Sequence, residues 1–191
     1  GASVILKNVE IMKEEGTSSS TESGDFYGMN AALLATGGAR VTVEDSAVHS
    51  AALNGNGLFS YGKGTGIFAK NVTITTEGSH SGGLQTTGGA LTEAENVTVS
   101  TAGNSSAAIR SDRGGGTVLV KGGTFRTEGY GSPAVYSTAD ISIEGGTSSA
   151  TCRSMAAAQA GSASCISLNA RSTILITAWQ PPLPCSSLWP A

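Results

Sequence analysis

The sequence contains little of what a compact globular core or a charged binding surface is usually built from. Aromatic residues make up 5% of its 191 residues, and charged residues 13%. A core built around large aromatic anchors is therefore excluded, whereas a narrow, elongated interior can be filled by Val, Ile, Leu and Ala. Lysine and arginine together number 11 against 14 aspartates and glutamates, which gives a net charge of −3. We expect no nucleic acid partner, because phosphate binding requires clustered positive charge.

Long hydrophobic runs are absent as well. No stretch approaches the roughly 18 consecutive apolar residues that a transmembrane helix needs, so we expect no membrane insertion. The chain does not begin with methionine and shows no signal-peptide pattern, and we therefore expect a fragment, without its signal peptide, of a longer protein. Its length suits one domain rather than two.

Glycine is abundant, with 27 residues, and the sequence repeats itself with a fixed period. Corresponding positions, nearly all apolar, recur in three separate columns every 25 or 26 residues, except for a step of 23 residues between Val118 and Ile141. The first column contains Leu33, Leu58, Leu84, Ile109 and Val135; the second contains Val48, Ile74, Val99 and Phe125; the third contains Val41, Ile67, Thr92, Val118 and Ile141. Three columns that keep one period indicate stacked units sharing a continuous core.

Each unit shows the alternation of apolar and polar residues that is typical of β-strands, as in Val118-x-Val120 and Ile141-x-Ile143. We expect three short strands per unit, separated by Gly, Asn, Asp or Thr. One column, at the corner between the second and third strands, holds residues that tolerate a positive φ: Asp45, Asn71, Asn96, Gly122 and Gly145. The sequence therefore predicts an all-β fold, a right-handed parallel β-helix with about 25–26 residues in each coil.

The same register predicts the domain boundaries. Residues 1–150 form the β-helix repeat domain, in which residues 2–11 match the end of a preceding coil and Asn8 falls in the corner column. The extra residues at about 14–29 do not follow the repeat, and we expect them to form a loop at one corner.

Residues 151–191 form a tail of different composition. The tail contains all three cysteines and both tryptophans, whereas no acidic residue follows Glu144. Two interpretations stay open: a cap over the open end of the solenoid, or a sequence read in a shifted frame. Residues 171–179 could add one strand. The cysteines lack CxxC spacing, and we place no site in this tail.

Four phrases of the repeat domain are distinctive: NGLFSYGKGTG (56–66), SGGLQTTGGA (81–90), NSSAAIRSDRGGGTV (104–118) and YGSPAVYSTADISI (130–143). In these phrases residues 1–150 resemble the adhesin-like, right-handed parallel β-helix proteins of anaerobic gut bacteria and archaea. The resemblance implies a surface-exposed or secreted repeat protein of the pectate-lyase-like superfold. It does not imply lyase activity, because one fold carries many functions.

One outward face of the coils carries the candidate ligand-binding residues. If Ile109 points inward, Arg110 and Asp112 point outward. The candidate glycan-binding face then contains Phe59, Tyr61, Gln85, Arg110, Asp112 and Tyr136. Aromatic rings can stack on sugars there, while the polar side chains bond to hydroxyl groups. The alternative is a solvated Arg110–Asp112 pair on a plain β face.

Catalytic patterns are not evident in the sequence. A polysaccharide lyase needs several carboxylates around Ca²⁺, yet Asp112 has Thr87 and Thr138 on the neighbouring coils. A glycoside hydrolase needs two facing carboxylates, and Glu93, Glu95 and Asp112 fall on different faces. We therefore expect no catalytic residue, no metal ligand and no cofactor.

Two further patterns are weaker. His49 and His80 are isolated in the sequence, and we expect both at the surface. An outward threonine array on the third strand includes Thr73, Thr98 and Thr124. Such ladders can bind ice, which is a minor alternative, although threonine also simply favours strands.

The role that these observations favour is a non-catalytic, adhesin-like structural module in the extracellular space or at the cell surface. Its expected partner is a polysaccharide or a glycan of a host or cell surface. The alternative is a fragment of a carbohydrate-active enzyme, a polysaccharide lyase or glycoside hydrolase, with its machinery elsewhere or around Asp25. We also expect self-association through the open coil ends, because unpaired strand edges can pair with another chain.

Overall fold

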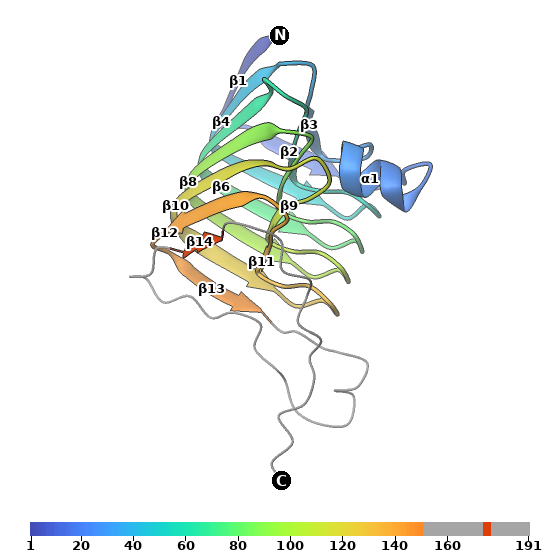
Figure 1. Ribbon diagram of the computed structural model, residues 1–191. Coiled ribbons are helices and arrows are strands. Elements are labelled where there is room, and N and C mark those ends of the chain that lie inside the picture. Colours follow the sequence, from blue (N-terminus) through green and yellow to red (C-terminus); the bar gives the residue numbers. More distant parts are fainter. Residues whose placement is uncertain (151–173, 177–191) are drawn as a thin grey trace.

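The computed structural model describes residues 1–150 and 174–176, which form a parallel β-solenoid of about five turns (Figure 1). Sheet A contains β1 (Ser3–Lys7), β2 (Glu10–Lys13), β4 (Arg40–Ser50), β6 (Gly66–Thr76), β8 (Ala90–Thr101), β10 (Gly116–Thr127), β12 (Asp140–Glu144), β13 (Thr147–Ala150) and β14 (Ile174–Ile176). Sheet B contains β3 (Leu33–Ala35), β5 (Leu58–Tyr61), β7 (Leu84–Thr87), β9 (Ile109–Ser111) and β11 (Val135–Tyr136). The predicted parallel β-helix is confirmed.

The register between coils follows the three sequence columns. Leu58 pairs with Leu33 on one side and with Leu84 on the other, and the column continues through Ile109 to Val135. The other two columns are also aligned rung by rung along sheet A. Apart from Thr92, the side chains of the three columns stack into one apolar core that runs along the solenoid, with Leu33 partly buried against it.

The corner column adopts the left-handed backbone conformation that its residue types predict. The φ values are 47° at Asp45, 53° at Asn71, 51° at Asn96, 65° at Gly122 and 70° at Gly145. This residue bends the strand without ending it, so the second and third expected strands are continuous in β4, β6, β8 and β10. They are separate in the incomplete first coil, as β1 and β2, and in the last coil, as β12 and β13. Side-chain hydrogen bonds along the corner link Asn96 to Asn71 and Asn71 to Asp45, each at 2.9 Å.

Both ends of the repeat domain carry additional pairing. Residues 2–11 form an incomplete first coil as predicted, because β1 and β2 pair in parallel with β4 and Asn8 has a φ of 54°. Within the predicted extra strand at 171–179, β14 pairs antiparallel with β12. Whether the tail is a cap or a shifted frame concerns residues that otherwise lie outside the described ones.

Buried polar residues are also stacked from coil to coil. Ser106 Oγ accepts a hydrogen bond from the backbone N–H of Ser81, and Ser132 Oγ accepts one from the N–H of Ser106, at 3.0 and 2.9 Å. All three serines are fully buried. Because buried polar groups need partners, this ladder fixes the position of each coil against the next.

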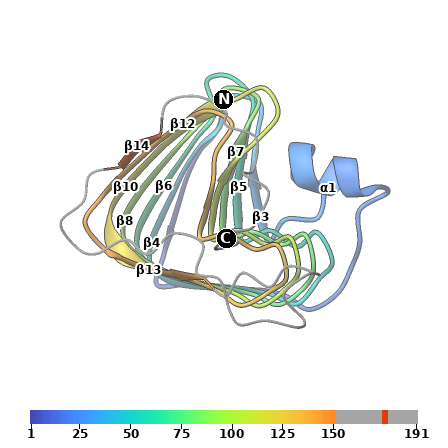
Figure 2. The same cartoon turned by 60° about the horizontal axis from the view of Figure 1, so that its bottom comes forward.

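The segment expected to be a loop contains a helix, α1 (Thr21–Tyr27). The Ser20 hydroxyl caps its first turn by accepting a hydrogen bond from the N–H of Ser23 at 3.0 Å. Gly28 ends it in the left-handed conformation, with φ at 68°. In Figure 2 this helix lies beside sheet B, next to β3, β5 and β7, so that a single insertion covers part of one solenoid face.

Candidate functional site

The helix α1 is attached to sheet B through the carbonyl groups of its last turn. The Gln85 side-chain amide donates a hydrogen bond to the carbonyl of Asp25, and the Thr87 hydroxyl donates one to the carbonyl of Phe26 at 2.7 Å. The last carbonyls of a helix have no partner within the helix. Outward side chains of β7 therefore provide donors that α1 lacks, and this fixes the helix to the sheet.

Two glycines allow the helix to approach closely. Gly24 packs directly on the side chain of Asn54, where an added Cβ would overlap Asn54. A Cβ at Gly28 would lie 2.7 Å from the ring of Phe59. Helix and sheet are consequently in backbone-level contact, and the Phe59 ring is fully buried between them.

Arg113 holds the outer side of the helix. Its guanidinium lies 4.0 Å from the ring centroid of Phe26 and forms an ion pair with Glu22. Hydrogen bonding to the Glu22 carboxylate raises the pKa of Arg113 above its ordinary value, so this group stays charged. Both partners of the ion pair are about half exposed, so we expect the ring contact to matter more than the ion pair.

The carboxylate of Asp25 points from α1 toward the solenoid. Its Oδ1 accepts a hydrogen bond from Asn54 Nδ2 at 3.0 Å. Its Oδ2 lies 3.4 Å from His80 Nδ1 and 3.7 Å from Arg110 Nη2. The Asp25 side chain is only 9% exposed. A buried carboxylate is stable here because polar and positively charged groups from three coils surround it.

Arg110 connects this carboxylate to the next groups along β9 and β11. Its Nε and Nη2 both donate to Asp112 Oδ2, at 3.1 and 2.6 Å. Its guanidinium carbon lies 5.5 Å from the ring centroid of Tyr136. The Arg110 and Asp112 side chains are 12% and 13% exposed. This is a largely desolvated pair, not the solvated surface pair considered as the alternative above.

These groups surround a pocket of about 270 Å³ at the edge of α1. Its lining residues are Asp25, His80, Ser105, Ala107, Arg110, Gly131, Pro133 and Tyr136. This volume is slightly smaller than that of the smallest pockets for drug-sized ligands, about 300 Å³. The pocket wall combines one aromatic ring and one proline with several polar groups that can donate or accept hydrogen bonds.

The six predicted site residues lie in different environments in the structure. Arg110 and Tyr136 line the pocket, and Asp112 supports Arg110. Phe59 and Gln85 are fully buried beneath α1 and cannot contact an external glycan there. This corrects the expectation of one continuous outward strip, because the inserted helix occupies the middle of that strip. Their neighbour in the strip, Tyr61, is partly buried, with its ring edge-to-face to that of Tyr27 at 5.4 Å.

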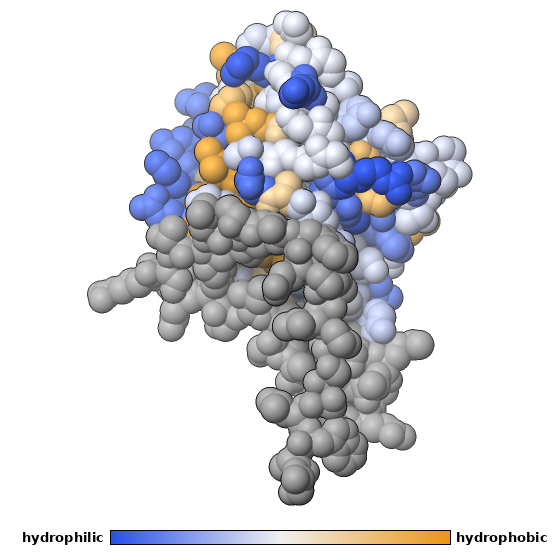
Figure 3. All heavy atoms as spheres, viewed as in Figure 1, coloured by the Kyte–Doolittle hydropathy of each residue, from blue (hydrophilic) through white to orange (hydrophobic). Residues whose placement is uncertain are grey.

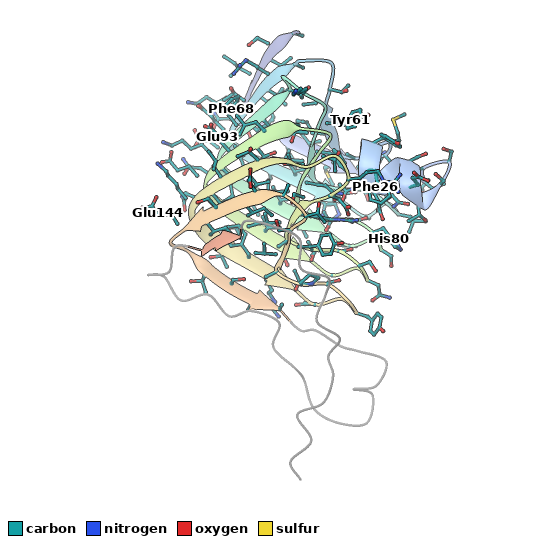
Figure 4. The ribbon with its side chains drawn as sticks, viewed as in Figure 1. Phe26, Tyr61, Phe68, His80, Glu93 and Glu144 are labelled. Carbon is teal, nitrogen blue, oxygen red and sulfur yellow. The ribbon has the colours of Figure 1, made fainter. Side chains whose placement is uncertain are left out.

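Two titratable residues of the pocket, Asp25 and His80, were not among the predicted site residues. Asp25 was placed in a loop, and His80 was expected to be an isolated surface residue. Their side chains meet although 55 positions separate them in the sequence, and no spacing pattern reveals such a contact. Figure 4 shows that Phe26, Tyr61 and His80 lie on the side of the solenoid that carries α1, and that Phe68 and Glu93 lie on the opposite side.

The opposite side carries a row of alternating charges along sheet A, which we call the charge row. It contains Lys7, Glu44, Lys70, Glu95, Lys121 and Glu144, one residue per coil. Lys70 Nζ lies 3.0 Å from a Glu95 carboxylate oxygen, and this hydrogen-bonded contact raises the pKa of Lys70. Figure 3 shows hydrophilic residues gathered along this edge beside an apolar patch. A hollow of about 460 Å³ lies there as well.

The remaining candidates lie elsewhere. The threonine array is in register, with Thr98 between Thr73 and Thr124, and its side chains are exposed. His49 lies in the neighbouring row, 3.9 Å from Glu77. Within residues 1–150 and 174–176, no group of three or more histidine, cysteine or carboxylate side chains is arranged to hold a metal ion.

No known protein family, curated protein or solved structure gives a significant match to this chain. In the part of the chain that the structure describes, no helix has the length and apolarity needed to cross a bilayer.

Proposed function

We propose that the protein is a non-catalytic, adhesin-like module that binds a carbohydrate in the pocket between α1 and sheet B. The observation that carries this proposal is the composition of the pocket wall. Tyr136 and Pro133 provide apolar surface against which the C–H face of a sugar ring can pack. Arg110, His80 and Asp25 provide donors and acceptors for its hydroxyl groups.

The rigidity of the site supports the same proposal. Arg110 and Asp25 are held by several contacts each, so little side-chain freedom remains to be lost when a ligand binds. The stacked coils hold the pocket on a stiff scaffold, which suits a module that presents a binding surface. The resemblance of its repeat phrases to adhesin-like β-helix proteins points in the same direction, and we assign the protein to the extracellular or cell-surface environment.

The proposal separates from the enzyme alternative in one experiment. A panel of polysaccharides is incubated with the protein, and each sample is read for retention and for chain cleavage, with and without EDTA. We expect retention without cleavage, and no effect of EDTA. Cleavage that EDTA abolishes would instead establish a metal-dependent lyase. The absence of both signals would leave a structural spacer and would refute carbohydrate binding.

Two variants assign the binding to the pocket. Tyr136→Ala removes the aromatic ring of the pocket, and we expect it to weaken retention about tenfold or more, a change of about 1.4 kcal/mol. Phe68→Ala removes an aromatic ring from the opposite side of the solenoid and is the matched control. Equal weakening by both variants would contradict the assignment. Thermal unfolding of each variant checks that the fold is retained.

A further inference from the structure

Every basic side chain in the pocket already faces a carboxylate of the protein. Arg110 donates two hydrogen bonds to Asp112, at 3.1 and 2.6 Å, and its Nη2 lies 3.7 Å from Asp25. His80 Nδ1 lies 3.4 Å from the same Asp25 oxygen. The pocket region thus contains two carboxylates, one guanidinium and one imidazole. Even with a protonated imidazole its formal charge does not exceed zero.

The pairing cannot easily be exchanged for pairing with a ligand. The side chains of Asp25, Arg110 and Asp112 are 9%, 12% and 13% exposed, so neither carboxylate can turn out into water at low cost. A carboxylate on a ligand would approach two carboxylates of the protein in a partly desolvated site. Juxtaposed like charges in such a site oppose binding and suppress the wrong partners.

A hydroxyl group meets no such obstacle. It can donate a hydrogen bond to the acceptor-only oxygens of Asp25 and can also accept one from a nitrogen donor. Arg110 has donors for this purpose, because its Nη1 makes no hydrogen bond to any residue that the structure describes. The chemistry of the pocket therefore matches a group that both donates and accepts, as the hydroxyls of a neutral sugar do.

We infer that the pocket binds a neutral sugar residue and discriminates against uronic acids, with Asp25 and Asp112 as the discriminating residues. This inference rests on the proposed function, because it specifies the class of sugar that the same pocket takes. The volume of about 270 Å³ limits direct contact to a short stretch of the glycan.

Matched ligand pairs test the inference at pH 7 by isothermal titration calorimetry. Oligogalacturonides are compared with the same oligomers after complete methyl esterification, which replaces each carboxylate by an uncharged methyl ester. Gluco-, galacto- and manno-oligosaccharides are compared with their uronic acid counterparts. We expect the neutral member of at least one pair to bind about tenfold or more tightly than the acidic member.

The outcomes separate the inference from the proposed function. Acidic members that bind as tightly as the neutral ones, or more tightly, would overturn the inference and leave carbohydrate binding in place. If no member of any pair binds, the proposed function itself fails.

A charge-neutralising variant tests the assignment to particular residues. Asp112 Oδ1 accepts a hydrogen bond from the backbone N–H of Arg113 at 2.8 Å. Asp112→Asn keeps an oxygen for this bond and removes the negative charge that pairs with Arg110. We expect the ratio of acidic to neutral affinity to rise about tenfold or more, because the freed guanidinium can pair with a ligand carboxylate. Asp45→Asn makes the same charge change at the distant corner column and should leave the ratio unchanged. An unchanged ratio in Asp112→Asn would overturn the assignment.

Discussion

Substitution of Phe59 tests whether this face of the solenoid is open to ligands or covered by α1. Its side chain points outward from sheet B, yet it is completely buried, because Gly28 of the helix terminus packs on its ring. On an open face, Phe59→Ala would remove a ligand contact and hardly change stability. Beneath a docked helix, the same substitution removes a core residue and leaves a cavity.

The expected magnitude follows from that burial. Replacing a fully buried phenylalanine by alanine costs about 3–5 kcal/mol, which combines the lost transfer free energy with the cavity left behind. Total domain stability is about 5–15 kcal/mol, so a large fraction would be lost. If α1 detaches in the variant, no enclosed cavity remains, and the loss of stability falls toward the lower end of the range of about 3–5 kcal/mol. The helix itself then becomes exposed.

Urea unfolding followed by circular dichroism measures the loss, and amide hydrogen exchange reports on α1. We expect faster exchange throughout Thr21–Tyr27 in the variant. Leu53→Ala is the control, because Leu53 is 45% exposed and its truncation should change stability by no more than about 0.5 kcal/mol. A loss below about 1 kcal/mol for Phe59→Ala would refute the docked arrangement.

Three further predictions test other parts of the structure. Gly24→Ala should loosen the docking of α1, because the added Cβ overlaps the Asn54 side chain, although the helix propensity of alanine alone would stabilise the helix by about 1 kcal/mol. Slower amide exchange in α1 of this variant would contradict the prediction. Asn96→Val should cost about 1–2 kcal/mol in urea unfolding because valine resists the left-handed corner, whereas Asn96→Gly should be nearly neutral, and equal losses would argue against a conformational cause. Lys70→Glu should lower the melting temperature more than Lys70→Gln, because it places like charges side by side in the charge row. Addition of 1 M NaCl should reduce the difference between the two variants, and a difference that does not depend on salt would exclude an electrostatic origin.

The solenoid was predictable because its determinants are local and repeated. The alternation of apolar residues specifies strands within each coil, and the corner residues specify where the strand bends. Asn71 and Asn96 have the backbone conformation expected for their residue type, and the register of Leu58 on Leu84 follows directly from the period. Each coil therefore repeats the pattern of its neighbours, and where the pattern is weak in one coil, the neighbouring coils still specify the register.

The helix was not predictable in the same way, because it occurs once and spans seven residues. Its docking depends on tertiary contacts such as the one between Gly24 and Asn54, which no periodic pattern encodes. One signal was available: Leu34 and Phe59 occupy outward positions on adjacent coils, and paired outward apolar residues indicate a covered face. The capping residues Ser20 and Gly28 were a second signal.

The candidate site was predictable in part for the same reason. Arg110 and Tyr136 are neighbours in register, so the repeat alone places them together. Asp25 reaches them only through the inserted helix, and His80 reaches Asp25 only because the turn between β6 and β7 faces that helix.

The central claim is that α1 and sheet B together form a sugar-binding pocket, and the two histidines of the chain test it most directly. His80 lines the pocket, whereas His49 lies in the row beside the threonine array. NMR measures the chemical shifts of the ring resonances of both histidines while neutral gluco-, galacto- and manno-oligosaccharides are added in separate titrations. The structure predicts that a bound sugar shifts His80 and the ring of Tyr136 and leaves His49 unmoved. Shifts at His49 with His80 unmoved, or no shift with any of the sugars, would contradict the claim.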